Sequence, residues 1–267
     1  MNARDNIRIA NCSGYYGDKL SAAKELIEGG PIDFLTGDYL AELTMGILYS
    51  QKLKRGEDMG YVGTFLKQYR DVAKTCQAKG IKIVVNAGGL NPKSMANELN
   101  KINEELSLEM NVAYIDGDDI VDDLSTLQDQ GEEFIHLDKH VPISSSGCEI
   151  ITANVYLGAW GIVKALDLGA DVVICPRVTD ASLVIGPAAW KFGWKRDDFD
   201  KLSGALAAGH IIECGAQTTG GNYAFFEEVE TFKDIGYPIA EIYEDGSFMI
   251  TKHENTGGLI SLSLIHI

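Results

Sequence analysis

The chain has 267 residues, and its 39 acidic side chains outnumber the 23 basic ones, which gives a formal net charge of −16 at pH 7. This balance argues against nucleic acid and anionic lipid as partners, because binding to either depends on clustered cations. Apolar residues make up 45% of the chain and charged residues 23%, which is typical of a folded globular domain and excludes general disorder. The sequence contains no apolar run of about 18 residues, so we expect no membrane span.

The cysteines and the first residues of the chain bear on its location. The five cysteines are widely separated and none belongs to a CxxC pair: Cys12, Cys76, Cys148, Cys175 and Cys214. This pattern predicts reduced thiols rather than a disulfide framework or a zinc site. Residues 1–8 are polar and lack the apolar centre of a signal peptide. We therefore expect a cytoplasmic protein.

Short β-branched runs alternate with amphipathic stretches along most of the chain. In chain order, strands are expected at residues 7–11, 32–36, 81–85, 112–115 and 171–175. Helices are expected at residues 19–27, 40–54, 61–79, 92–108, 120–128, 150–168, 181–192 and 201–212. Beyond Gly220 the chain changes to alternating aromatic segments at residues 223–232, and Asp245-Gly246 predicts a hairpin between residues 239–243 and 248–251.

Strands separated by helices predict an α/β fold, with a mainly parallel, Rossmann-like sheet covered by helices on both faces. The late hairpin is expected to extend this sheet in the antiparallel direction. A closed parallel β/α barrel is the alternative. Residues 1–260 are expected to form a single, incomplete domain. Residues 261–267 end without a cap or a charged end; we interpret them as a read-through tail, with a genuine final strand as the alternative.

The loops that follow the strands are the candidate ligand sites, because ligands of parallel sheets bind beyond the carboxyl ends of the strands. Asn11 begins the first of these loops. In residues 86–92, Gly88 and Gly89 allow backbone N–H groups to approach an anion or carbonyl group, beside the Asn86 amide. A simple tight turn is the alternative reading of this loop. Neither a P-loop nor a GxGxxG loop is present.

A second glycine-rich segment, residues 213–222, is dense in small donors and acceptors and suits recognition of a carboxylate, carbonyl or phosphate group. Its candidate binding residues are Thr218, Thr219 and Asn222. A linker is the less favoured interpretation, because apolar segments flank it closely.

Four charged residues near these loops are candidates for chemistry. Arg177 is expected to bind an anionic substrate group. Asp38, Asp180 and Glu213 are the candidate acid–base residues; Glu213 follows Ile211 and Ile212, and an apolar setting would raise its pKa. The structural alternatives are that Asp180 caps a helix with Arg177 as its partner, and that Glu213 caps a backbone group.

Three weaker patterns are noted without being assigned. His136 and His140 have a spacing that binds metal on a helix, although their polar context favours a loop. An acidic cluster, Asp116, Asp118 and Asp119, could hold Mg²⁺ but is more typical of a solvated turn. Cys12 and Cys214 could be nucleophiles, but inert thiols are commoner. The sequence therefore predicts no metal site and names no cofactor.

Several long segments resemble, in the same order, the acyclic terpene utilisation AtuA family. The resemblance runs to about Gly258 and is carried by residues 8–18 (RIANCSGYYGD), 30–45 (GPIDFLTGDYLAELTM), 86–92 (NAGGLNP), 153–159 (ANVYLGA), 177–183 (RVTDASL) and 209–222 (GHIIECGAQTTGGN).

The resemblance implies a role in the breakdown of acyclic terpenes such as citronellol and geraniol, beside enzymes that act on branched acyl-CoA thioesters. On this basis we expect a lyase- or hydratase-type enzyme that applies acid–base chemistry to a branched acyl-CoA or related carboxylate. The alternative is a non-catalytic subunit or binding module of an acyl-CoA carboxylase-type assembly.

Overall fold

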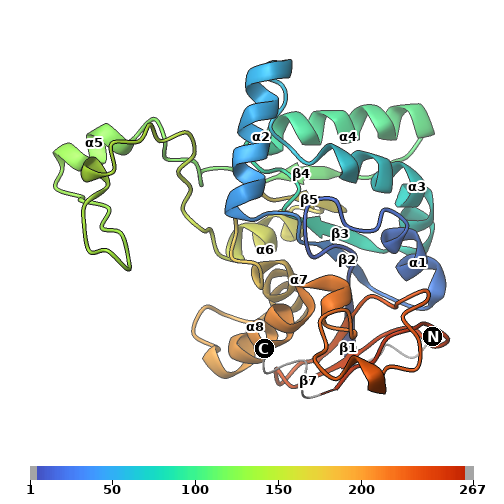
Figure 1. Ribbon diagram of the computed structural model, residues 1–267. Coiled ribbons are helices and arrows are strands. Elements are labelled where there is room, and N and C mark those ends of the chain that lie inside the picture. Colours follow the sequence, from blue (N-terminus) through green and yellow to red (C-terminus); the bar gives the residue numbers. More distant parts are fainter. Residues whose placement is uncertain (1–4, 262–267) are drawn as a thin grey trace.

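The computed structural model describes residues 5–261, which form a seven-stranded sheet in the order β4-β5-β3-β2-β1-β6-β7 (Figure 1). The strands are β1 (Asn6–Asn11), β2 (Phe34–Gly37), β3 (Lys82–Val85), β4 (Val112–Tyr114), β5 (Val172–Ile174), β6 (Ile239–Tyr243) and β7 (Phe248–Thr251). β1 to β5 pair in parallel, whereas β6 is antiparallel to β1 and β7 to β6. The mainly parallel α/β class with an antiparallel hairpin is confirmed. The sheet is open, with β4 and β7 at its edges, and is not the alternative closed barrel.

Helices cover both faces of the sheet. The helices are α1 (Ala22–Gly29), α2 (Glu42–Arg55), α3 (Gly63–Lys79), α4 (Pro92–Leu106), α5 (Leu124–Asp129), α6 (Trp160–Asp167), α7 (Ser182–Phe192) and α8 (Phe199–Ile212). One apolar core joins the sheet to α1–α4 and the other joins it to α6–α8. Within residues 5–261, no helix combines the length and the apolar character that a membrane span requires.

The side chains of β3 point alternately to the two faces of the sheet, so this short strand contributes to both apolar cores. Ile83 and Val85 lie in the first core, while Val84 lies in the second, and all three are fully buried. Successive side chains of a strand point to opposite faces, so a β-branched run with no polar member fits a sheet that is covered on both sides.

The predicted hairpin is present. Gly246 has φ +87°, a backbone conformation that favours glycine, and the Ser247 amide donates to the Asp245 carboxylate at 2.9 Å. Asp245 and Gly246 therefore form the turn between β6 and β7, and β7 lies at the edge of the sheet.

One predicted helix is wrong in its extent. The predicted helix 150–168 begins only at Trp160, because residues before it give their backbone groups to other segments: the Val155 amide donates to Asp118 O at 2.8 Å and the Leu157 amide to Arg177 O at 3.2 Å. The alternating aromatic segment, residues 223–232, contains a short 3₁₀ turn, Phe226–Glu228. Of the predicted tail, residues 262–267 lie outside the described residues.

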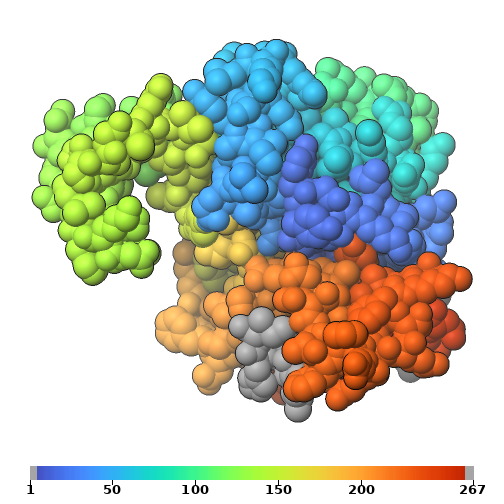
Figure 2. Space-filling view, viewed as in Figure 1, coloured from blue at the N-terminus to red at the C-terminus, as the bar shows by residue number. Residues whose placement is uncertain are grey.

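Residues 119–158, which we call the arm, connect β4 to α6 along the chain. Figure 2 shows this segment, in yellow-green, projecting from the body. The arm contains α5 and a 3₁₀ turn, Ile143–Ser145, and its outer part stands clear of the body. None of its residues is buried, whereas Asp118 and Ala159 on either side of it are. Of the arm, only Leu157 at its returning end packs against an apolar core, the one that joins the sheet to α6–α8.

Candidate active site

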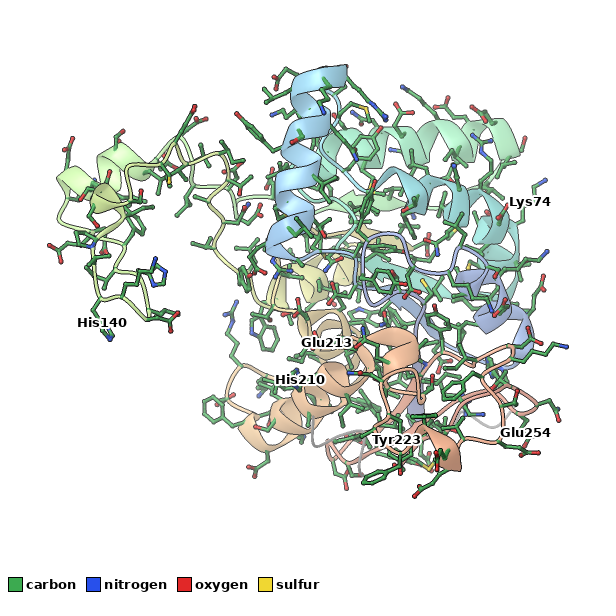
Figure 3. The ribbon with its side chains drawn as sticks, viewed as in Figure 1. Lys74, His140, His210, Glu213, Tyr223 and Glu254 are labelled. Carbon is green, nitrogen blue, oxygen red and sulfur yellow. The ribbon has the colours of Figure 1, made fainter. Side chains whose placement is uncertain are left out.

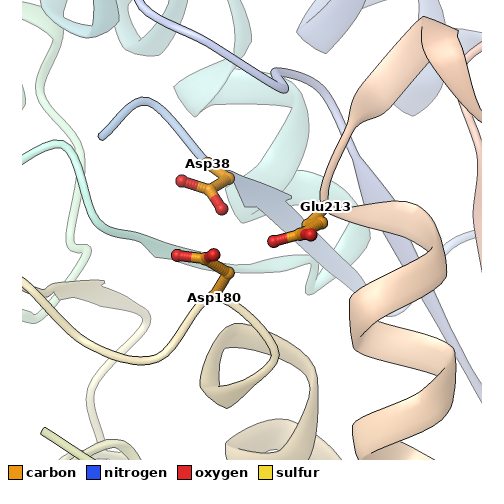
Figure 4. A group of neighbouring side chains, drawn as sticks. All are labelled: Asp38, Asp180 and Glu213. Atoms are coloured by element: carbon orange, nitrogen blue, oxygen red, sulfur yellow. The ribbon is translucent and has the colours of Figure 1, made fainter. Parts of the chain in front are cut away.

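Three carboxylate side chains converge at the carboxyl edge of the parallel strands (Figure 4). Asp38 follows β2, Asp180 precedes α7 and Glu213 follows α8. One carboxylate oxygen from each residue lies within 4.8 Å of the corresponding oxygens of the other two. We call these three residues the carboxylate cluster.

Asp38 is the most buried member of the cluster. Its Oδ1 accepts hydrogen bonds from Asn86 Nδ2 at 2.6 Å and from the Leu40 amide at 3.3 Å. Asn86 is fully buried, and its Oδ1 accepts from the Tyr39 amide at 2.8 Å. Burial, together with the charge of Asp180, raises the pKa of Asp38 to about 7 despite these donors. Asn86 therefore orients Asp38. Its amide nitrogen and oxygen both have partners within the protein, and its predicted role in binding a ligand stays a prediction.

Glu213 reaches the cluster because Asn11 holds the end of α8 against the end of β1. Asn11 Nδ2 donates to Ile212 O at 2.7 Å and to Glu213 O at 2.9 Å, which pairs carbonyls that a helix end leaves free. The Glu213 carboxylate lies 3.2 Å from Nδ1 of His210, one turn back on α8 (Figure 3). Burial and the neighbouring Asp180 raise the pKa of Glu213 to about 8. Asn11 is thus engaged in positioning Glu213.

Asp180 and Arg177 lie on the loop between β5 and α7. The Asp180 side chain does not cap α7, whose first turn has no side-chain cap. Its Oδ1 lies 3.4 Å from Nη1 of Arg177. The Arg177 side chain is only 6% exposed, and its Nη1 also donates to Leu40 O at 3.0 Å. Of the structural alternative, the Arg177–Asp180 contact is present and the helix cap is not. The substrate-binding and acid–base roles of these two residues stay predictions.

Two residues that the sequence analysis did not single out complete the setting of Arg177. Tyr156, where the arm returns to the body, accepts from Arg177 Nη2 at 2.8 Å and stacks its ring 4.3 Å from the guanidinium carbon. The Tyr156 hydroxyl in turn donates to Glu42 on α2. Both residues lie in segments that carry the family resemblance, but nothing in their spacing indicates that they meet.

Asp118 belongs to the same framework rather than to a separate acidic site. Its Oδ2 accepts from the Arg177 amide at 3.1 Å and from Asn154 Nδ2 at 2.8 Å. Asp118 therefore ties both ends of the arm to the β5–α7 loop. Asp116 and Asp119, its partners in the weak magnesium hypothesis, are exposed.

The backbone donors of the Gly88–Gly89 turn have partners within the protein. The Gly88 amide donates to Cys175 O at 3.1 Å and the Gly89 amide to Asn86 O at 3.3 Å, so the geometry is that of a tight turn. A Cβ at position 88 would lie 2.6 Å from Cys175 O, so glycine is required there by the close approach of β5. Anion binding by these glycines stays a prediction, and the donors on which it relied are engaged.

The glycine-rich segment after α8 is likewise held by internal bonds. The Thr218 hydroxyl donates to Ile211 O and the Thr219 hydroxyl to Ala216 O, the latter at 3.2 Å. Asn222 is exposed and lines a surface hollow with Tyr223 and Phe232, neither of which belongs to the carboxylate cluster. Ligand binding by these residues stays a prediction.

The weaker candidates, the two thiols and the histidine pair, are not part of the carboxylate cluster. Burial raises the pKa of the Cys12 thiol to about 12 and that of Cys214 to about 11, which disfavours the nucleophilic thiolate. His136 and His140 are exposed, and neither lies on a helix. Figure 3 shows His140 on the arm.

The arrangement favours proton transfer. Two carboxyl groups whose pKa values are raised to about 7 and about 8 change protonation state near neutrality, as acid–base chemistry requires. The third, Asp180, lies 3.4 Å from the Arg177 cation. Three carboxylate oxygens at this separation also suit a hard divalent cation such as Mg²⁺.

The fold and the site define an α/β protein with a cluster of three carboxylates at the carboxyl edge of its parallel strands. The chain belongs to the acyclic terpene utilisation family AtuA, whose family model matches residues 7–266. No curated protein and no solved structure matches the chain.

Proposed function

We propose that this protein is an enzyme of acyclic terpene breakdown that applies acid–base chemistry to a branched acyl-CoA or related carboxylate. The observation that carries the proposal is the convergence of Asp38, Asp180 and Glu213, two of which have pKa values near neutrality. A hydratase or lyase needs one group that accepts a proton and another that donates one, and both must be usable at the working pH.

In this mechanism Asp38, with the lower pKa, is the base, and Glu213, with the higher pKa, is the acid. Asn86 fixes Asp38, so that its second oxygen is directed to the proton that it removes. Arg177 supplies the positive charge that keeps Asp180 beside the other two carboxyl groups. Burial excludes water from Asp38, which strengthens each of these interactions.

The proposal is tested with CoA thioesters of the branched acids derived from citronellol and geraniol, with conversion followed by liquid chromatography and mass spectrometry. We expect Asp38→Asn and Glu213→Gln each to lower kcat by roughly 100-fold or more. Asp116→Asn is the matched control, because Asp116 is an exposed acid on a neighbouring loop. Activity of the unaltered protein should peak between pH 7 and pH 8. Retained turnover in both cluster variants contradicts the proposal.

The competing proposal is a non-catalytic subunit of an acyl-CoA carboxylase-type assembly. The exposed arm favours it, since a long segment without buried side chains is suited to contact another chain. A subunit of this kind would bind a thioester without converting it and would co-purify with a carboxylase component. An enzyme converts its substrate when purified alone.

A further inference from the structure

The arm cannot be stable by its own internal contacts. Its regular structure consists of a six-residue helix, a 3₁₀ turn and two isolated bridges, one between Ile135 and Pro142 and one at its base between Asp119 and Asn154. Helices this short and single strand pairs are marginal in water. Apolar side chains nevertheless lie on its surface, and Leu137 is 87% exposed. The arm therefore offers apolar area to another surface.

The arm is also strongly acidic. It carries eight Asp and Glu residues, and Lys139 is the only lysine or arginine in it. The negative charges of the arm repel one another and the acidic body, which opposes non-specific packing of the arm against the body. A surface that receives the arm must combine apolar side chains with positive charge.

The outer face of α2 has this combination. A surface hollow along this helix is lined by Leu43 and Ile47 toward its first turns and by Lys54 and Arg55 at its end. Leu43 is 77% exposed. Within residues 5–261, neither Lys54 nor Arg55 forms an ion pair. On an acidic chain, such a face is a specific counterpart for an acidic, apolar segment.

We propose that two copies of this chain pair reciprocally, with the arm of each copy lying on the outer face of α2 of the other. The chain carries both complementary surfaces, and a two-fold pairing makes the same contact twice. The returning end of the arm is fixed at the start of its own α2 through Tyr156 and Glu42. From there the arm leads outward, and His140 lies at its outer end, away from the body (Figure 3). A second copy is thus better placed to receive it than its own helix.

The test uses two charge-reversed forms of the full chain, with mass measured by light scattering after size-exclusion chromatography. The first carries Lys54→Glu and Arg55→Glu on α2. The second carries Asp122→Lys, Asp123→Lys, Glu132→Lys and Glu133→Lys on the arm. The control carries Lys67→Glu and Lys74→Glu, two exposed lysines on α3, of which Lys74 lies far from the arm (Figure 3).

We expect the unaltered chain and the control to be dimers. Each reversed form alone should dissociate at least ten-fold more readily, because an acidic arm then meets an acidic helix, or a basic arm a basic helix. An equimolar mixture should restore a dimer that contains one copy of each form, since both of its arm–helix contacts are again between opposite charges. This restoration also proves that each form is folded.

Three outcomes overturn the proposal. A monomeric unaltered chain means that the arm folds onto its own α2 or serves a different protein. A dimer that survives both reversals uses another surface. Reversed forms that are monomeric alone and stay monomeric when mixed show that the arm and α2 are not counterparts.

Discussion

At the scale of single residues, burial of Asp38 sets the chemistry of the site. Asp38 directly follows β2, and its carboxylate accepts hydrogen bonds from the Asn86 side chain and the Leu40 amide. Its pKa is nevertheless raised to about 7 from an ordinary value of 3.8. The loss of water and the nearby Asp180 charge outweigh the two hydrogen bonds. Glu213 shows the same effect at the end of α8. A proton is thus retained at neutral pH where an exposed carboxylate would have lost it.

This retention makes stability depend on pH. Between about pH 4 and pH 7 the folded state binds a proton at Asp38 more tightly than the unfolded state does, so the contribution of Asp38 to the free energy of unfolding falls as the pH rises. Asp38→Asn keeps the accepting oxygen and removes the ionisation. We expect it to raise the free energy of unfolding at pH 8 by about 1–3 kcal/mol and to change it little at pH 4.

Urea titrations of both proteins at the two pH values measure this difference. Asp116→Asn, on an exposed loop, should show no such pH-dependent gain. An equal effect of Asp38→Asn at both pH values would mean that Asp38 is already ionised at low cost in the folded protein.

At the scale of elements, α8 connects the hairpin to the site. The helix packs against the β6–β7 turn through Gly204, where an added Cβ would lie 1.9 Å from Gly246 O. The other end of α8 is held by Asn11 and delivers Glu213 to the cluster. The predicted hairpin therefore helps to determine the position of α8 along the sheet, and with it the position of Glu213.

Gly204→Ala is expected to lower the free energy of unfolding by about 1–3 kcal/mol, because the turn backbone must move to admit the methyl group. Gly63→Ala is the matched control: it begins α3 with no atom within 4 Å of the added Cβ and is expected to be neutral or slightly stabilising. Chemical denaturation followed by circular dichroism measures both variants. Equal stability of the two would show that α8 tolerates displacement from the turn.

At the scale of the whole molecule, Arg177 joins three parts of the fold. Its side chain contacts Leu40 in the β2–α2 connection, Glu42 on α2 and Tyr156 where the arm returns. The sequence predicts a cation for the substrate at this position, whereas the guanidinium is surrounded by protein acceptors. Arg177 therefore holds the loops of the carboxyl edge together.

We expect Arg177→Ala to lower the free energy of unfolding by about 2–4 kcal/mol, because it leaves the buried Leu40 carbonyl without this donor and Asp180 without its cation. Arg177→Lys retains the charge without the planar fork and should lose about half as much. Differential scanning fluorimetry gives the midpoints, with Arg70→Ala as the control because its ion pair with Glu105 is exposed. An unchanged midpoint in Arg177→Ala, with weaker thioester binding, would restore the substrate-binding role.

The sequence by itself determined the order and type of most elements, since β-branched runs and glycine or proline boundaries are local signals. It also placed Asp38 and Asp180 after parallel strands, so their meeting at one edge was predictable. Only the tertiary structure decided that Glu213 joins them from a helix end, that Tyr156 covers Arg177, and that residues 150–159 are not helical. Each of these depends on partners distant in the chain, and burial, which sets the pKa values, exists only once those partners have packed.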